Sequence, residues 1–465
     1  LKVEAFLNDD SGAYRRLRRV MDAWCALWFW PLTDDLTQGA APPNLDEWLD
    51  GVTALIGGHS RATARKAGEG AQQFGLPTGW DDLEEAEKDD LDWSSALDVD
   101  DALASHPWLR VTERIADANG FFHWELDFAG VFARGGFDLQ VGNPPWVRPR
   151  SDVEALLAEG DPWWQLAVKP TQTEVKAKRE QTLAIEGIRD LVVDGTADVA
   201  CTAAFVGSPI VYPHLAGLQP DLYRCFMELT WSHLSPTGAV ALIHPESHFT
   251  DEKAGHLREA TYTHLRRHWQ FMNELVLFEI DHHVSYGVHV YGTPRKPRFR
   301  MATNLYHPET VVGSLRHNGD GPEPGIKNVD GKWDLSAHSG RITVVDDDVL
   351  RSWHGLLEDE STPIRRTRMV YAVNRATAAV LAKLADAPRL GSLGLEFSRG
   401  WDESIDRKKG MFDVEWGEVE SWDQAILQGP HLFVGNPFYK SPNASMSNNK
   451  DWSPVDLETL APNAM

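Results

Sequence analysis

The sequence predicts an α/β fold built on a parallel sheet. Two short apolar strands, residues 137–141 (FDLQV) and 239–243 (AVALI), are separated by a polar helical stretch over 151–200 and an amphipathic helix over 221–234. Strand, long helical crossover and strand is the pattern of parallel strands. The 465 residues are 42% hydrophobic and 25% charged, which is an ordinary globular composition and excludes collagen, wholesale disorder and a disulfide miniprotein.

The segment before the first strand is predicted to be helical. Leu17, Val20 and Trp24 recur at the spacing of one helix face, and residues 23–32 (AWCALWFWPL) read as a buried helix that is too short to span a membrane. Residues 81–101 carry 11 acidic side chains in 21, which predicts a solvated face or loop.

The elements after the second strand follow from similar patterns. A basic helix is predicted over 256–268, followed by strands at 274–278 (ELVLF) and 287–291 (GVHVY) that form a hairpin at the sheet edge. Residues 292–340 are rich in Gly, Pro and Asn and are predicted to be loops or a linker. Helix returns over 350–384.

The net charge of −24 makes the chain a poor non-specific binder of nucleic acid. A DNA-binding protein with this charge must concentrate its basic residues, and the sequence does so in three places. The phosphate-contact candidates are Arg148 and Arg150, then Arg295, Lys296, Arg298 and Arg300, and finally Arg407, Lys408 and Lys409.

No metal site is predicted. The three cysteines (Cys25, Cys201 and Cys225) form no zinc framework and favour a reducing cytoplasm. The pairs His244 with His248 and His282 with His283 are interpreted as loop histidines near the active cleft. Asp221, Asp251 and Lys253 formally fit a metal-dependent nuclease, but Asp221 opens a helix, where an N-cap aspartate is expected. The tryptophans Trp163 and Trp164 are interpreted as packing residues.

The segment 137–146 (FDLQVGNPPW) carries the chemistry. Pro144 and Pro145 fix the backbone and remove two N–H donors, and Pro144 keeps Asn143 out of the helical conformation. The result is a rigid loop at the carboxyl end of a strand, where ligands bind in open α/β sheets. The Asn143 side-chain oxygen and the Pro144 carbonyl can accept both hydrogens of an exocyclic amine, and Trp146 offers a flat face to a base.

This motif resembles the catalytic motif of S-adenosyl-L-methionine (AdoMet)-dependent DNA amino-methyltransferases of the N6-adenine class. Residues 221–249 resemble the helix, glycine turn and fifth strand of that Rossmann-like class I fold, and 274–291 resemble its sixth and seventh strands. The closest resemblance is to type IIG restriction–modification and phage-defence enzymes. It implies a helical insertion with an acidic loop at 1–110, a catalytic region at 111–305, a linker and helical connector at 306–385, and the start of a mixed α+β target-recognition domain at 386–465.

The resemblance also implies roles and partners. Asn143, Pro144 and Trp146 would carry catalysis, Pro145 would shape the loop, and Asn143 would also contact the cofactor, AdoMet. The macromolecular partner would be double-stranded DNA with the target base flipped out, together with subunits of a defence system, and no membrane is involved. Transfer would be direct, since no Pro-Cys motif provides the nucleophile of cytosine-C5 chemistry.

One family motif is not found in the sequence. The AdoMet-binding loop, a strand followed by Phe-x-Gly-x-Gly, does not occur, and the glycines of 51–75 lie in a helical context. We therefore expect the AdoMet-binding half to lie before Leu1, so that this chain is an inactive fragment with weak AdoMet binding.

Other functions stay open on the residues alone. The loop can also hold an N4-cytosine, RNA-base or protein-glutamine amine, although the long insertion and the recognition-like C-terminal region favour DNA. A non-catalytic DNA-binding subunit would fit the missing AdoMet motif. Asn436-Pro437-Phe438 is a near copy of the motif without the second proline, and it is interpreted as a loop of the recognition domain.

Overall fold

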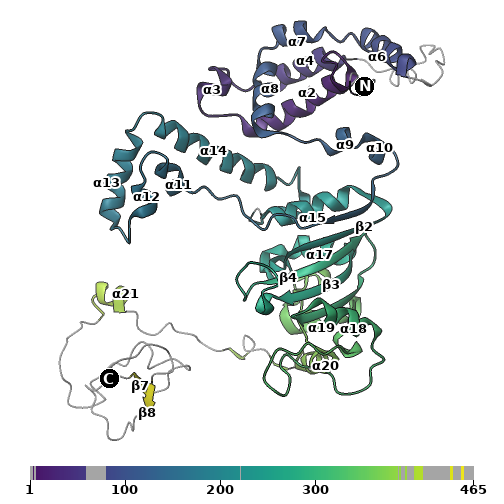
Figure 1. The fold of residues 1–465 in the computed structure, drawn as a ribbon, viewed down its shortest axis with the longest axis vertical. Helices are drawn as coiled ribbons and strands as arrows, with labels where there is room; N and C mark the ends of the chain where they lie inside the picture. The colour runs from purple at the N-terminus through teal and green to yellow at the C-terminus, as the bar shows by residue number, and fades with distance from the viewer. Residues whose placement is uncertain are drawn as a thin grey trace. The chain divides into compact units, whose positions relative to one another are not determined.

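The computed structural model describes residue 4, residues 7–58, 80–219 and 221–385, and short stretches at 387–388, 393–394, 403–411, 440–442 and 452–454. The chain divides into two compact units, Leu1–Ala387 and Pro388–Met465 (Figure 1). In the second unit the described elements are α21 (Glu403–Lys408) and the antiparallel pair β7 (Lys440–Pro442) and β8 (Trp452–Pro454). Over the described residues, no helix has the length and apolar character needed to cross a membrane.

Four of the N-terminal helices of the first unit share an apolar cluster. Asn44 begins α4 with a capping box to Glu47, and Leu55, Leu103 and Trp108 are buried between the helices. The helix predicted over 23–32 is shorter than expected, because α2 passes into a 3-10 turn at Leu27–Phe29. The helices are α2 (Ala13–Ala26), α3 (Asp34–Thr37), α4 (Leu45–Ile56), α6 (Trp80–Ser94), α7 (Val99–Ser105), α8 (Trp108–Asn119), α9 (Trp124–Asp127) and α10 (Ala129–Phe132).

The acidic loop expected at 81–101 is wrong as a loop, because most of this segment is helical. Within α6 the acidic side chains Asp89 and Asp92 are exposed to solvent. Asp98 then caps α7 by accepting a hydrogen bond from the Asp100 amide at 2.9 Å. Asp98 therefore stabilises the start of α7, while other acidic side chains of the segment are exposed to solvent.

The helical stretch predicted after the first strand is confirmed. Thr171 and Glu174 form a capping box, and Trp164 donates from Nε1 to Thr182 Oγ1 at 3.0 Å. Trp164 is buried with Leu157, while Trp163 packs against this small core, so the packing role predicted for both tryptophans is confirmed. The helices are α11 (Val153–Ala158), α12 (Trp163–Leu166), α13 (Gln172–Leu183) and α14 (Ile188–Val206).

A six-stranded mixed sheet in the order β1-β2-β4-β3-β5-β6 forms the centre of the unit (Figure 1). The pairs β1–β2 and β3–β5 are parallel, and the other three neighbouring pairs are antiparallel. The predicted strands 137–141, 239–243 and 287–291 are confirmed. The edge position predicted for 287–291 is wrong, because that strand lies between two others inside the sheet. The strands are β1 (Phe137–Gly142), β2 (Leu234–Pro245), β3 (Leu265–Met272), β4 (Ser285–Gly292), β5 (Arg298–Leu305) and β6 (Thr343–Asp346).

The two faces of the sheet bury different cores. One core joins Leu242 and Tyr291 of the strands to Tyr223, Tyr262 and Trp353 of three helices. The other core joins Trp269 and Phe271 to Val311 of a fourth helix. The helices of the first face are α15 (Leu222–Ser232), α17 (Gly255–His264) and α19 (Asp347–Leu357), and that of the second is α18 (Pro308–Arg316).

The strand predicted at 274–278 is wrong, and the strand that replaces it lies earlier. The predicted basic helix ends at His264, and Leu265–Met272 forms β3 instead. Residues 273–278 loop around buried Asn273, whose Nδ2 donates to the Phe278 carbonyl at 3.0 Å. Val276 stands in the left-handed region at a φ of 51° and is exposed, so this apolar run has no place in the sheet.

Three further boundaries differ from expectation. The loops predicted for 292–340 contain β5 and α18, and the helix predicted for 350–384 is interrupted between α19 and α20 (Arg375–Leu384). The glycine turn at 236–238 lies inside β2. There a Cβ on Gly238 would come within 2.5 Å of the Phe137 carbonyl oxygen, so the close approach of β1 requires glycine.

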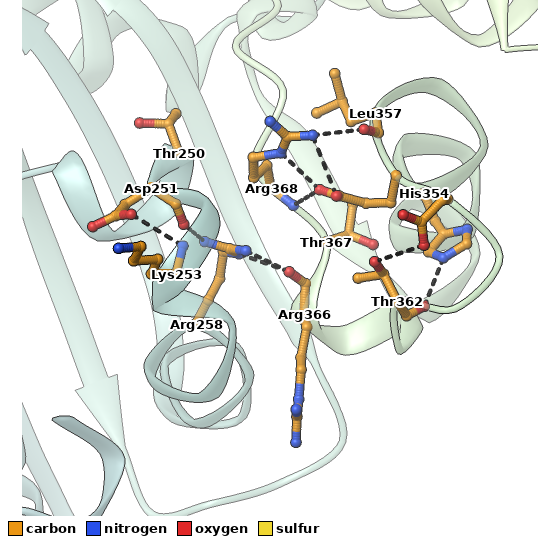
Figure 2. Close-up of polar contacts among 12 residues, drawn as sticks. Thr250, Asp251, Lys253, Arg258, His354, Leu357, Thr362, Arg366, Thr367 and Arg368 are labelled. Atoms are coloured by element: carbon orange, nitrogen blue, oxygen red, sulfur yellow. Dashed lines mark hydrogen bonds and ion pairs between the residues drawn. The ribbon is translucent and has the colours of Figure 1, made fainter. Parts of the chain in front are cut away.

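A buried arginine ties the interrupted stretch to the sheet's helical cover (Figure 2). The Arg258 guanidinium donates to the Arg366 carbonyl through Nε and Nη2 at 2.9 and 2.6 Å. Its Nη1 donates to the carbonyls of His248 and Asp251 at 2.9 and 2.7 Å. One cation therefore satisfies three carbonyls from two segments that lie far apart in the sequence. Arg368 binds Glu358 alongside them.

Replacing Arg258 by Met is expected to lower the free energy of unfolding by roughly 3 kcal/mol, because three buried carbonyls lose their donor. Chemical denaturation followed by circular dichroism measures the change. Arg351→Ala, which removes an exposed ion pair with Asp348, is the control and should cost about 0.5 kcal/mol or less. Equal effects for the two variants would contradict the anchoring role of Arg258.

Candidate active site

The Asn-Pro-Pro-Trp loop leaves β1 at the edge of the sheet where the parallel strand β2 also ends. Residues 143–150 have no regular secondary structure, which follows from the two consecutive prolines. Pro144 is buried and Asn143 is exposed. The proline therefore anchors the loop while the amide side chain faces solvent at the strand's carboxyl end, where a ligand can reach it.

Trp146 is held against the sheet and is not a free platform. Its Nε1 donates to the Ile243 carbonyl of β2 at 3.2 Å, and its ring centroid lies 6.0 Å from that of Tyr286 and 6.3 Å from that of Phe278. The indole is partly buried in the core of the second face. It fixes the loop geometry, and only the remaining part of its surface is accessible to a base.

The residues after Trp146 are fastened to the start of α15. The Val147 carbonyl accepts from the Leu222 amide at 3.0 Å. Arg148 donates from Nε to Asp221 Oδ2 at 3.1 Å and from Nη1 to Gln219 Oε1 at 2.8 Å. The side-chain cap expected of Asp221 is wrong, because its carboxylate binds Arg148 instead and makes no cap hydrogen bond. Arg148 is consequently engaged within the protein.

The formal nuclease pattern serves structural purposes. Asp251 Oδ1 accepts from the Lys253 amide at 3.1 Å, and Asp251 Oδ2 lies 3.5 Å from Arg224 Nη2. Asp221 is committed to Arg148. These contacts favour the structural interpretation of the acidic pair.

The strand β1 is an edge strand with an uncovered apolar face. Its polar side is satisfied, since Asp138 accepts from Ser235 Oγ at 3.0 Å and Gln140 Nε2 donates to the Thr230 carbonyl at 2.8 Å. Leu139 and Val141 are 65% and 73% exposed. Within the described residues β1 pairs only with β2, so its second edge is unpaired. Phe137 at the start of the strand packs against Trp124 and Phe132, while Leu139 and Val141 stay uncovered.

The basic candidates differ in how far they are already paired. Arg150 is exposed and has no ion-pair partner in the described part of the chain. Lys296 Nζ lies 3.6 Å from Asp347 Oδ2, and Arg295, Lys296 and Arg298 line a shallow pocket of about 300 Å³ with three aspartates, Asp346–Asp348. Arg300 is exposed on β5, and Arg407, Lys408 and Lys409 are exposed at α21 in the second unit.

The histidines near the loop divide into two kinds. His282 and His283 are exposed, as expected of loop residues. The prediction for His244 and His248 is wrong, because both are completely buried, His244 in β2 and His248 in the short helix α16 (Ser247–Thr250). His244 Nε2 lies 2.7 Å from Tyr291 Oη, and burial lowers the His244 pKa to about 4.

Sequence reasoning missed three buried residues beside them, Glu246, His268 and His289. The sequence offered one signal, because His289 lies between the two valines of GVHVY. His268 follows Arg267 in LRRHWQFM and gave none. The near copy of the motif at Asn436-Pro437-Phe438 and the glycines Gly68 and Gly70 lie outside the described residues.

Sequence comparison supports a restriction–modification methylase. The model of the Eco57I restriction-modification methylase family matches residues 78–169, which contain β1 and the Asn143–Trp146 loop. A comparison with curated proteins gives no match.

Two solved structures resemble the chain weakly. The ATP-dependent Type ISP restriction-modification enzyme LlaBIII bound to DNA is 11% identical with a TM-score of 0.20, over 36% of this chain and 10% of that one. The M protein of the Type I restriction enzyme EcoKI is 11% identical with a TM-score of 0.24, over 86% of this chain and 100% of that one. Likenesses at these scores add nothing to the fold or to the site.

Acidification is expected to destabilise the first unit. Burial lowers the pKa of His244 to about 4 and that of His268 to about 3, from a usual value of 6.5. Between those values the unfolded chain binds more protons than the folded one, so stability falls as pH drops from 6.5 toward 4. Each histidine contributes about 2 kcal/mol of loss at pH 5.

Urea denaturation in the presence of a metal chelator, at pH 7.5 and at pH 5, measures this loss. Glu246 acts in the opposite direction, because burial raises its pKa and favours folding at low pH, but His248 and His289, whose pKa values are also lowered, reinforce the histidine effect. The exposed double variant His282→Gln, His283→Gln should keep the full dependence. A flat profile in the wild type would contradict the burial of neutral histidines.

Proposed function

We propose that this chain supplies the amine-holding part of an AdoMet-dependent DNA methyltransferase that acts on the N6 amine of a flipped-out adenine in restriction–modification or phage defence. The observation that carries this proposal is the exposure of Asn143 at the carboxyl end of β1, on a loop fixed by buried Pro144 and by Trp146. The family match over residues 78–169 supports the same class.

The chain's own residues would hold and orient the amine. Asn143 Oδ1 and the Pro144 carbonyl would accept its two hydrogens and so draw the nitrogen lone pair out of conjugation with the ring. The hydrogen bond from Trp146 to Ile243 keeps the loop in place, so that the acceptors need no reorganisation when the base arrives. AdoMet, when bound, supplies an electrophilic methyl group.

The described residues form only part of an AdoMet site. Asn143 stands at the carboxyl edge of the sheet, where an AdoMet contact is expected. No glycine-rich loop accompanies it among the described residues, and the sequence has no Phe-x-Gly-x-Gly motif. The open edge of β1, with Leu139 and Val141 uncovered, is suited to pair with a further strand. We propose that the AdoMet-binding half of the enzyme occupies this edge and covers those side chains.

The substitution Asn143→Ala is expected to reduce methyl transfer by a factor of about 10² or more, because one of two fixed acceptors is lost. Transfer of radiolabelled methyl groups from AdoMet to duplex DNA is measured with the chain alone and with the AdoMet-binding half of a related methyltransferase supplied in trans. Asn318→Ala, in an exposed loop, is the matched control and should keep full transfer.

The identity of the product separates the remaining functions. Nucleoside analysis by mass spectrometry should detect N6-methyladenine; N4-methylcytosine, methylated RNA or methylated protein would each replace the adenine assignment. If the complemented wild type transfers no methyl group to any acceptor and still binds DNA, the chain is a non-catalytic DNA-binding subunit.

The triple substitution of Arg295, Lys296 and Arg298 by Ala is expected to flatten the salt dependence of DNA binding. Each lost phosphate contact lowers the log–log slope by about 0.9, and Lys296 contributes less because Asp347 already pairs with it. Fluorescence anisotropy between low and moderate salt gives the slope. A triple replacement of exposed Lys176, Arg179 and Arg189, with the same charge loss, should leave it unchanged; equal slopes for both triples would remove the first cluster from the interface.

A further inference from the structure

A carboxylate and two imidazoles meet on the face of the sheet that carries Leu242. Glu246 directly follows β2, His268 lies in β3, and His289 lies in β4 between them. His268 and His289 are register partners across the antiparallel pair, so their side chains project to the same face. All three side chains are at least 95% buried, at 5%, 0% and 0% exposure respectively.

The distances within this Glu246–His268–His289 cluster are those of a metal-binding group. Glu246 Oε1 lies 3.1 Å from His268 Nε2 and 3.6 Å from His289 Nε2, and one ligand atom from each residue lies within 4.8 Å of the others. Ligands about 2.0–2.1 Å from a tetrahedral ion stand roughly 3.3 Å apart. The spacing therefore accommodates an ion bound by two nitrogens and an oxygen.

The cluster lacks other partners for its polar atoms. Both ring nitrogens of His268, both of His289, and Glu246 Oε1 have no hydrogen-bond partner among the described residues. Buried polar groups in folded proteins are almost always bonded, so these unpaired atoms need an explanation. One atom from each of the three residues can face a common point. A bound cation would satisfy one nitrogen of each ring and the carboxylate oxygen together.

The protonation states suit a metal. Burial lowers the His268 pKa to about 3 and holds the His289 pKa well below its usual value, so both rings are neutral and carry a free lone pair. Burial raises the Glu246 pKa well above its usual value in the absence of a cation. A divalent ion would restore the carboxylate form by supplying the missing counter-charge.

The backbone leaves room for the cluster at one position. A Cβ on Gly287 would lie 2.2 Å from His289 Cε1, 2.4 Å from His289 Nε2 and 2.7 Å from Glu246 Oε1. Any side chain at Gly287 would therefore displace two members of the cluster. This makes Gly287 a position at which the cluster can be disturbed without removing a ligand.

Aromatic rings pack against the two imidazoles of the cluster, and the nearby arginines bind other groups. His244 stacks on His289 with centroids 3.9 Å apart, and Phe249 packs edge-on against His268 at 4.9 Å. The nearby cations Arg258 and Arg224 are engaged elsewhere, the first by backbone carbonyls and the second by Ser247 and Asp251. Neither arginine pairs with Glu246 in the described structure. The Tyr371 hydroxyl lies beside the carboxyl and lowers its pKa, but it supplies no positive charge, so a cation would still be the counter-charge of Glu246.

We propose that Glu246, His268 and His289 bind one divalent transition-metal ion of the zinc class as a structural centre of the sheet. Two imidazoles and a single carboxylate select zinc, cobalt or nickel over calcium and magnesium, which require oxygen ligands. The ion would fasten the end of β2 to β3 and β4. Since β2 also positions the Asn143 loop, the centre would stiffen the sheet beneath that loop, but it holds whether or not the chain methylates DNA.

The test measures metal content and not activity. The full chain is expressed in zinc-supplemented medium, desalted and analysed by plasma mass spectrometry, and it is also refolded with Co²⁺ to record visible d–d absorption. We expect close to one metal ion per chain and the bands of a nitrogen–oxygen site. The variants Glu246→Gln, His268→Gln and His289→Gln should each lose at least nine-tenths of the metal.

Two controls keep the outcome decisive. The double variant His282→Gln, His283→Gln removes the exposed Asp281–His282–His283 group, the other metal-like cluster of the described residues, and should keep full binding. Gly287→Ala keeps all ligands and should weaken binding at least tenfold. The proposal is overturned if the wild type holds less than one-tenth of an equivalent of metal, or if only the His282/His283 variant loses metal. If a ligand variant fails to fold, the refolded wild type decides, and absence of its cobalt bands overturns the proposal.

Discussion

The rest of this structure depends on the pairing of β2 along both of its edges. On one side the parallel ladder to β1 fixes where that strand ends and so where Asn143 stands. On the other side the antiparallel ladder to β4 sets Leu242 opposite His289 and His244 opposite Gly287. The strand β2 thus fixes both the exposed loop that follows β1 and the buried cluster of Glu246, His268 and His289.

The loop and the cluster are coupled through two faces of one strand. The Ile243 carbonyl accepts the Trp146 indole N–H, and the side chains of both residues pack against the core of the second face. His244 stacks on His289 on the opposite face. Side chains alternate along a strand, so adjacent residues of β2 serve different cores. A shift of one residue in the β2 register would move the indole anchor and bury the wrong side chains, which is why both ladders must hold the same register.

The sequence allowed β1, β2 and β4 to be predicted because apolar residues dominate them, and it allowed the Asn143 loop to be located because consecutive prolines dictate its shape. The strand β3 (LRRHWQFM) was missed, since its buried positions carry histidine and glutamine. ELVLF was assigned to a strand because it is apolar, but Asn273 holds it as a loop. Local pattern fails where long-range contacts decide burial.

The same contrast explains why one site was visible in the sequence and the other was not. Asn143, Pro144 and Trp146 lie within four consecutive residues, so the amine-holding role proposed for them could be predicted from that short motif and the strand before it. Glu246, His268 and His289 come together only through the strand order β2-β4-β3, which places the last strand in sequence between the other two. Each residue alone looks like an ordinary polar side chain in an apolar segment. Their meaning depends on register, because a carboxylate and two neutral imidazoles that share one buried point need a common partner.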